Sequence, residues 1–333
     1  MPHQNSPPNI AVVIKESDIG ARLLADPPSG VKIIECTDRD TRLDRLTQAD
    51  ALITESWAPA PDQAPNLQWI QLLSVGYDHL DQEVLSHPGW NITHGGGASA
   101  VPIAEWCVGM MLRFAHRFDD IANYQRRRSW WSDRIRDMTS TTLRNAVVGI
   151  LGYGAIGREV ARQCAALGMQ VHASLGRHGK KRADTFAVAG TGDPDGKMPA
   201  QWFAMDQFAE AVGAFDYLVL SLRSTAATQN IINKNILGRC KNTAILINPA
   251  RGDLIDDTAL TCALSQGQIG GAALDVFRIE PLPSDSPLYG TPNIVISPHC
   301  SPESAFFRHQ LDACIRQNIS RFASGKPLVN LIQ

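Results

Sequence analysis

Three side chains of complementary chemistry lie in the last third of the chain, each shortly after an apolar segment. They are Arg251, Glu280 and His299, and they follow the segments 244–248, 271–276 and 294–297. An arginine binds a carboxylate through two parallel hydrogen bonds and polarises a neighbouring carbonyl. A histidine exchanges protons near neutrality, and a carboxylate beside it favours its charged form and fixes its orientation. Together these groups suit the reduction of a ketone by hydride transfer, which needs a grip on the substrate and a tuned proton source.

Taken alone, each of the three residues has a structural alternative. Arg251 suits a surface ion pair, Glu280 before Pro281 an ordinary loop residue, and His299 after Pro298 a capping or core residue. If the three segments are strands of one parallel sheet, however, their carboxyl ends lie at the edge where such sheets bind ligands. We therefore interpret the three residues jointly as candidate catalytic residues.

A glycine-rich turn lies near the middle of the chain. Its sequence, Gly152-Tyr153-Gly154-Ala155-Ile156-Gly157, has the pattern G-x-G-x-x-G, follows a strand-like run at 146–151 and opens an amphipathic helix. In this context the glycines permit a tight turn, close approach of a dinucleotide's diphosphate, and close helix packing. The diphosphate is expected at the helix N-terminus, where amide groups and the helix dipole favour an anion. The alternative is a glycine turn that binds no ligand.

The end of the next expected strand, at 170–174, lacks the acidic residue that NAD-binding domains usually place there for the ribose hydroxyls. Ser174 and Leu175 stand at this point, and Arg177 follows. Without a carboxylate nothing repels a 2′-phosphate, to which Ser174 can hydrogen-bond and Arg177 can pair in a bidentate manner. The segment favours NADP(H) over NAD(H); the alternative is a solvated basic loop.

These groups must be positioned by strands that alternate with helices, and the apolar pattern of the sequence predicts where the strands lie. The expected strands are 10–14, 31–35, 51–54, 69–73, 90–93, 146–151, 170–174, 217–221, 244–248, 271–276 and 294–297. A long helix is expected from Pro102 to Ile121, and a final helix runs through Phe322, with Ser301 as N-cap and Pro302 as first residue. The segment 179–205 is expected to be a surface loop with short elements. We predict two α/β domains.

Composition narrows the class of protein. The 333 residues, 44% of them hydrophobic, suffice for about two domains. The net charge of −2 argues against nucleic-acid or membrane-surface binding, and no apolar run is long enough for a membrane span. The polar start lacks the features of a signal peptide, and the seven scattered cysteines suggest neither a disulfide framework nor a zinc site. We expect a cytoplasmic enzyme that holds no metal.

In combination, the motifs make the chain similar to the D-isomer-specific 2-hydroxyacid dehydrogenases, and most like the NADPH-dependent glyoxylate/hydroxypyruvate reductases. The resemblance is carried by the segments 74–78, 102–105, 151–157, 247–252, 273–277, 280–283 and 297–299. It implies two Rossmann-like or flavodoxin-like doubly wound domains: residues 1–101 with 300–333 for the substrate, and 102–299 for the dinucleotide. It also implies an active site in the interdomain cleft and a homodimer that involves the long helix after Pro102.

The resemblance further implies reduction of a small 2-oxo acid to the D-2-hydroxy acid with NADPH. Arg251 and the amides of Val75 and Gly76 would bind the substrate, and His299, paired with Glu280, would be the acid/base. Besides the glycine turn, Ser174 and Arg177, the implied cofactor contacts are Leu222, Arg223, Pro249, Ala250 and Asp275. Two alternatives stay open: an NAD-dependent dehydrogenase that works oxidatively, and a non-catalytic, corepressor-like dinucleotide sensor on the same fold.

The chain departs from the family pattern at several points, which bear on the substrate rather than the reaction. Leu175 replaces the acid of NAD-using members, Arg223 replaces a common proline, and Cys300 begins a sequence that replaces a small, glycine-containing one. The insertion at 190–199 is longer than typical. Trp130 and Trp131 stand either near a substrate pocket or in an interface or core.

Overall fold

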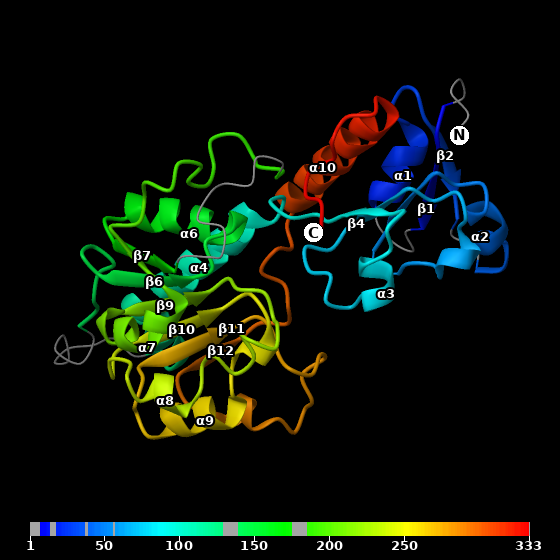
Figure 1. Ribbon diagram of the computed structural model, residues 1–333. Coiled ribbons are helices and arrows are strands. Elements are labelled where there is room, and N and C mark those ends of the chain that lie inside the picture. Colours follow the sequence, from blue (N-terminus) through cyan, green and yellow to red (C-terminus); the bar gives the residue numbers. More distant parts are fainter. Residues whose placement is uncertain are drawn as a thin grey trace. The chain divides into compact units, whose positions relative to one another are not determined.

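A computed structural model describes residues 7–13, 18–36, 39–55, 57–128, 139–174 and 185–332 (Figure 1). The chain forms two compact units. The first contains the described parts of 1–99, 185–189 and 304–332, and the second contains the described parts of 100–174 and 190–303. Each unit is built around a parallel sheet with helices, which confirms the predicted fold class.

The first unit, over its described residues, has a sheet with the strand order β2-β1-β3-β4-β5. Its strands are β1 (Asn9–Val13), β2 (Lys32–Glu35), β3 (Ala51–Thr54), β4 (Trp69–Leu72) and β5 (Asn91–Thr93). Its helices are α1 (Asp18–Ala25), α2 (Arg39–Leu46), α3 (Gln82–Leu85) and α10 (Ala305–Ala323). The central strands β3 and β4 are buried at every position, as expected for strands covered on both faces. The strand order is flavodoxin-like.

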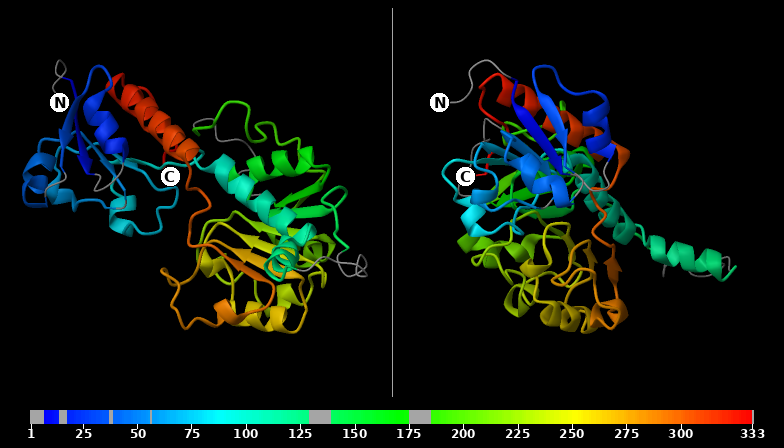
Figure 2. Two further views of the ribbon diagram at one scale, coloured as in Figure 1. Left: turned by 180° about the vertical axis from the view of Figure 1, so that it is seen from behind. Right: turned by 90° about the vertical axis from the view of Figure 1, so that its right-hand side faces the viewer.

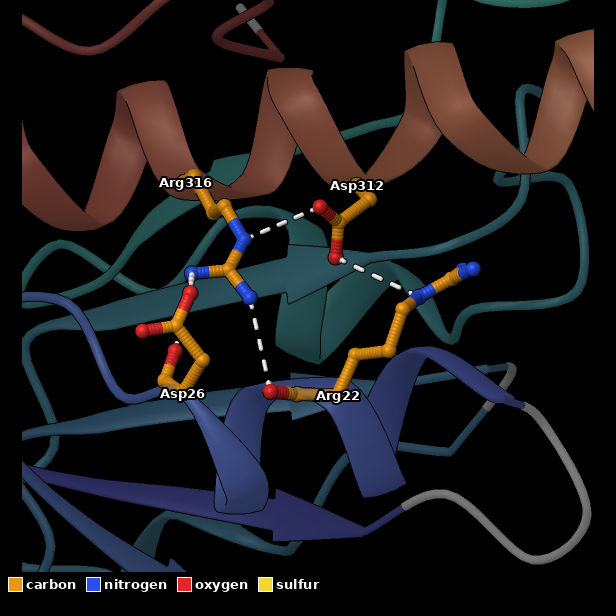
Figure 3. Close-up of polar contacts among 4 residues, drawn as sticks. All are labelled: Arg22, Asp26, Asp312 and Arg316. Carbon is orange, nitrogen blue, oxygen red and sulfur yellow. Dashed lines mark hydrogen bonds and ion pairs between the residues drawn. The ribbon is translucent and has the colours of Figure 1, made fainter.

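Helix α10, the last of the chain and drawn in red, packs on this N-terminal sheet (Figure 2). One hydrophobic cluster joins them, and it includes Leu311, Ile315, Ile319, Ile10, Val12 and Trp69. On the helix surface, Arg316 donates from Nε to Asp312 at 2.9 Å and from Nη1 to the carbonyl of Asp26, after α1, at 2.9 Å (Figure 3). Burial of this apolar stripe makes the C-terminal helix part of the N-terminal unit.

The second unit, over its described residues, has a sheet with the order β12-β11-β10-β9-β6-β7-β8. Its strands are β6 (Val147–Leu151), β7 (Gln170–Ser174), β8 (Gln201–Phe203), β9 (Tyr217–Leu220), β10 (Ile245–Asn248), β11 (Gly271–Leu274) and β12 (Ile294–Ile296). Its helices are α4 (Ala100–Ala115), α5 (Phe118–Arg126), α6 (Ala155–Ala166), α7 (Phe208–Ala211), α8 (Lys234–Leu237) and α9 (Asp257–Ser265). The direction of winding reverses between β6 and β9, and doubly wound sheets bind ligands outside the carboxyl ends of the strands at such a point.

Single-turn 3₁₀ helices occur in both units, at Pro61–Gln63, Met205–Gln207, Val212–Ala214, Gly252–Leu254 and Pro287–Gly290. Within the described ranges, no helix has both the length and the apolar character needed to cross a membrane.

Two sequence predictions about elements were wrong in detail. The long helix after Pro102 is two helices, because Arg117 between them has a left-handed backbone with φ 55°. The N-cap of α10 is Ser304 and not Ser301, since the Ser304 hydroxyl accepts from the Phe307 amide at 3.0 Å. The three-residue strand β8 lies inside the segment 179–205, where a surface loop with short elements was expected. Trp130 and Trp131 lie outside the described residues.

Candidate active site

The glycine turn between β6 and α6 needs glycine at two of its positions. Gly152 has φ +95°, and a Cβ there would lie 2.5 Å from the Ser221 carbonyl oxygen in the loop after β9. A Cβ on Gly157 would lie 2.2 Å from the Gly152 carbonyl oxygen. The turn is therefore pressed against the β9 loop and against the first turn of α6, which leaves no room for larger residues.

The remaining glycine of the motif, Gly154, differs from these two, because its surroundings are open. Apart from its two chain neighbours, no atom of the described residues lies within 4 Å of the place where its Cβ would be, and both Gly154 and Ala155 are exposed. The first amides of a helix have no partner inside the helix, so those of α6 suit an anion. The turn and the first residues of α6 form a cradle, which we term the dinucleotide cradle, and it fits the diphosphate of a dinucleotide. The residues that would hold the diphosphate are Gly152, Tyr153, Gly154, Ala155, Ile156 and Gly157.

Ser174, at the end of β7, is buried beneath this turn. Its hydroxyl oxygen accepts a hydrogen bond from the Gly152 amide at 2.8 Å, and only 1% of the residue is exposed. The structure thus gives Ser174 a part in shaping the turn, which the sequence did not indicate, and its predicted contact with a 2′-phosphate stays a prediction. Leu175 and Arg177 lie outside the described residues. Arg223 is exposed in the loop after β9, and Leu222 beside it packs against the core.

His299 and Glu280 come together at the carboxyl edge of the sheet. His299 Nδ1 lies 2.8 Å from Glu280 Oε2, and the other oxygen of Glu280 accepts from the Phe277 amide at 2.8 Å. The His299 and Glu280 side chains are 47% and 35% exposed, so both are open to a small molecule. With Nδ1 engaged by the carboxylate, Nε2 is the ring atom placed to exchange a proton.

A buried carboxylate holds the loop that carries His299. Asp275, fully buried, accepts from the Ser297 hydroxyl at 2.5 Å and from the amides of Cys300 and Ser301 at 2.9 Å each. The His299 amide donates to the Asp275 carbonyl at 2.8 Å, and His299 has a left-handed φ of 52°. A non-glycine residue there costs about 1–3 kcal/mol, which these hydrogen bonds offset. Sequence reasoning missed this role, although an aspartate inside the apolar segment 271–276 was a signal for it.

The loop after β10 carries Arg251 and packs on the loop that carries Glu280. A Cβ on Gly252 would lie 2.0 Å from the Phe277 carbonyl carbon, so the two loops touch through backbone. Arg251 Nη1 donates to the Ala250 carbonyl at 2.7 Å. Buried Asn248, which the sequence analysis did not select, fixes this turn by accepting from the Ala250 amide at 3.0 Å and donating to the Arg251 carbonyl at 2.8 Å. Pro249 is buried in the same turn.

Val75 and Gly76 belong to the first unit, in the loop after β4. Both residues are half-buried, and the Ser74 hydroxyl orders the loop by donating to the Gly76 carbonyl at 2.7 Å. Their predicted contact with a substrate carboxylate stays a prediction.

Sequence comparison finds known relatives of this chain. Residues 108–301 match the family model described as D-isomer specific 2-hydroxyacid dehydrogenase, NAD binding domain. The chain is 32% identical over 270 residues to glyoxylate/hydroxypyruvate reductase B of Pectobacterium carotovorum, covering 81% of this chain and 80% of the relative.

Two solved structures share the fold across almost the whole chain. A D-isomer specific 2-hydroxyacid dehydrogenase family protein of Aeromonas salmonicida is 27% identical, with a TM-score of 0.80 over 98% of this chain and 99% of that one. The NADPH-dependent glyoxylate/hydroxypyruvate reductase of Sinorhizobium meliloti, solved with NADP and sulfate, is 24% identical, with a TM-score of 0.77 over 98% of both chains.

Proposed function

Since the chain belongs to the D-isomer specific 2-hydroxyacid dehydrogenase family and is thus an oxidoreductase that uses a nicotinamide dinucleotide, we propose that it reduces a small 2-oxo acid to the D-2-hydroxy acid with NADPH. The substrate we propose is of the glyoxylate or hydroxypyruvate kind, the substrates that name its relative. The observation that carries the proposal is the His299–Glu280 pair at the carboxyl edge of a sheet that also holds a dinucleotide cradle.

The proposed mechanism assigns one task to each residue. NADPH, when bound, supplies the hydride. His299, with Nδ1 held by Glu280, donates a proton from Nε2 to the carbonyl oxygen of the substrate, and the Glu280 carboxylate stabilises the charged imidazole. Arg251 binds the substrate carboxylate and polarises the carbonyl. The amides of Val75 and Gly76 complete the grip on the carboxylate. Orientation of the reactants by these groups lowers the entropic part of the barrier.

A spectrophotometric assay tests the proposal. The purified protein is mixed with NADPH or NADH and with glyoxylate, hydroxypyruvate, pyruvate or a bulkier 2-oxo acid, and the loss of absorbance of the reduced cofactor is followed. We expect turnover with a small 2-oxo acid and NADPH, and a D-configured product where the product is chiral. Turnover only in the oxidative direction with NAD would replace the proposal by an NAD-dependent dehydrogenase. Dinucleotide binding without any turnover would favour the sensor.

The cofactor preference is expected to depend on Arg177. Replacing it with alanine should weaken NADPH binding by about 10- to 100-fold and NADH binding by less than about twofold, because only NADPH has the 2′-phosphate with which a guanidinium pairs. Fluorescence titration of each cofactor measures both constants. The exposed Arg223 is a second candidate, so R223A is made in parallel. If R177A weakened both cofactors equally, Arg177 would have no part in the preference.

We also propose that the chain forms a homodimer through α4 and α5. Helix α5 contributes no buried residue to its own unit, while Phe118 and Ile121 on it are 49% and 50% exposed. Apolar side chains in such a position suit a subunit interface. Ile121→Glu should convert dimers to monomers in size-exclusion chromatography with light scattering. Leu167→Glu, at another exposed apolar site (41%), is the control. A monomeric wild type would remove this proposal.

A further inference from the structure

The insertion at 190–199 lies against the first turn of α6, directly beside the dinucleotide cradle. Two contacts anchor it there. The Gly192 amide donates to Oε2 of Glu159 at 2.6 Å, and Glu159 is fully buried. Asp193 accepts from the hydroxyl of Tyr153 at 2.6 Å, and only 3% of Asp193 is exposed. Tyr153 stands between Gly152 and Gly154, so the second anchor ends on the phosphate-binding turn itself.

Three side chains form this second anchor, which we term the clasp: Tyr153, Arg158 and Asp193. The guanidinium of Arg158 stacks 4.8 Å from the centre of the Tyr153 ring, and its Nη1 donates to the Asp193 carbonyl at 2.5 Å. The rings of Trp202, in β8, and Tyr153 pack in an edge-to-face arrangement, with centroids 4.9 Å apart. The Tyr153 ring is thus held by a hydrogen bond, a cation–π contact and an aromatic contact.

The Asp193 carboxylate also orders the insertion. Its oxygens accept the amides of Lys197 and Met198 at 2.9 Å each, which closes the turn 193–198. Burial favours a higher pKa for Asp193, but these bonds, the Tyr153 hydroxyl and the Arg158 charge outweigh it and hold the pKa below its ordinary value. Burial and the Asp193 carboxylate raise the pKa of Tyr153, so the phenol keeps its proton and remains the donor.

We propose that the insertion 190–199 is a positioning element for the dinucleotide: Asp193, through Tyr153, holds the turn Gly152–Gly157 in the form that receives the diphosphate before any ligand arrives. This inference rests on the proposed use of a nicotinamide dinucleotide. A loop that must be ordered on binding reduces affinity, so a turn ordered in advance binds more tightly. The clasp contacts the turn from within the protein, and none of its groups takes part in the reaction. It should therefore act equally on NADPH and NADH and leave the chemical step alone.

Tyr153→Phe is the sharpest test, because it removes one hydroxyl and keeps the ring that Arg158 and Trp202 contact. We expect Kd for both NADPH and NADH to rise by about tenfold, since a hydrogen bond to a charged group is lost. In the ligand-free protein, amide hydrogen exchange over 152–158 should become faster. Asp193→Asn should act in the same direction but more weakly, because its amide oxygen still accepts from the Tyr153 hydroxyl and only the charge is lost. For Asp193→Asn, a change outside the turn itself, kcat at saturating cofactor should stay within about twofold of the wild type. The double variant should resemble Y153F, because both changes act on the same hydrogen bond.

Two matched controls separate this role from general loosening. Tyr289→Phe removes a hydroxyl from an exposed tyrosine of the same unit, and Asp195→Asn changes an exposed carboxylate of the same insertion. Both controls should leave the Kd values and the exchange of the turn unchanged. If Y153F binds both cofactors as the wild type does, or if only kcat falls, the clasp has no positioning role. If the wild type itself binds neither cofactor, the proposed function fails and this inference fails with it.

Discussion

Replacing His299 with alanine should lower kcat by about a thousandfold, within the range of 10² to 10⁴ typical for a lost general acid or base. Nδ1 of the His299 imidazole is engaged by Glu280 at 2.8 Å, and the His299 side chain is nearly half exposed. We expect no other residue of this edge to replace His299 as the proton donor. Binding of the dinucleotide should change by less than about twofold, because the cradle lies at the β6–α6 turn and not at the β12 loop.

Steady-state kinetics and a cofactor titration together check this prediction. His309→Ala, at an exposed histidine of α10, is the matched control and should leave kcat unchanged. Glu280→Gln keeps the size of the side chain but removes the charge that stabilises the imidazolium, so its kcat should fall by less than that of H299A. A variant H299A with normal turnover would end the acid/base assignment, whereas loss of cofactor binding would mean that the substitution disturbed the fold.

Replacing Arg251 with lysine should lower kcat/KM for the 2-oxo acid by about 10²- to 10³-fold, even though the positive charge remains. A lysine has no planar fork of donors, so it cannot bind a carboxylate in a bidentate manner and polarise the adjacent carbonyl at the same time. The loss of one well-placed donor to the developing charge usually has an effect of this size. The turn around residue 251 should stay intact, because Asn248 and Gly252 fix its backbone.

The readout for Arg251 includes an unreactive ligand, so that binding and chemistry are separated. Oxamate is isosteric with a small 2-oxo acid, and its affinity for the complex with reduced cofactor should fall in R251K along with kcat/KM. Arg239→Lys, at an exposed arginine of the same unit, is the control and should match the wild type. Unchanged affinity for oxamate in R251K would show that Arg251 does not bind the carboxylate.

Local sequence predicted most of the secondary structure, and the family resemblance implied the pairing at the centre of the site. Strands 51–54 and 170–174 were predicted with the observed bounds. For 51–54 the signal was a run of apolar and β-branched residues. The pairing of Glu280 with His299 was also expected. The break at Arg117 was not, since the apolar spacing continues through it, and the edge strand β8 was too short for its pattern to be recognised.

The sequence by itself determined which chemical groups the protein has and where along the chain the strands that carry them lie, because residue type and apolar periodicity are local properties. Only the tertiary structure decided what the buried polar side chains do. Asp275 accepts hydrogen bonds from the loop that carries His299, and Ser174 accepts one from the glycine turn. Asp193 in the insertion accepts a hydrogen bond from Tyr153, 40 positions earlier. A buried hydrogen-bonding group must find a partner wherever the folded chain places one, and sequence distance gives no measure of that proximity.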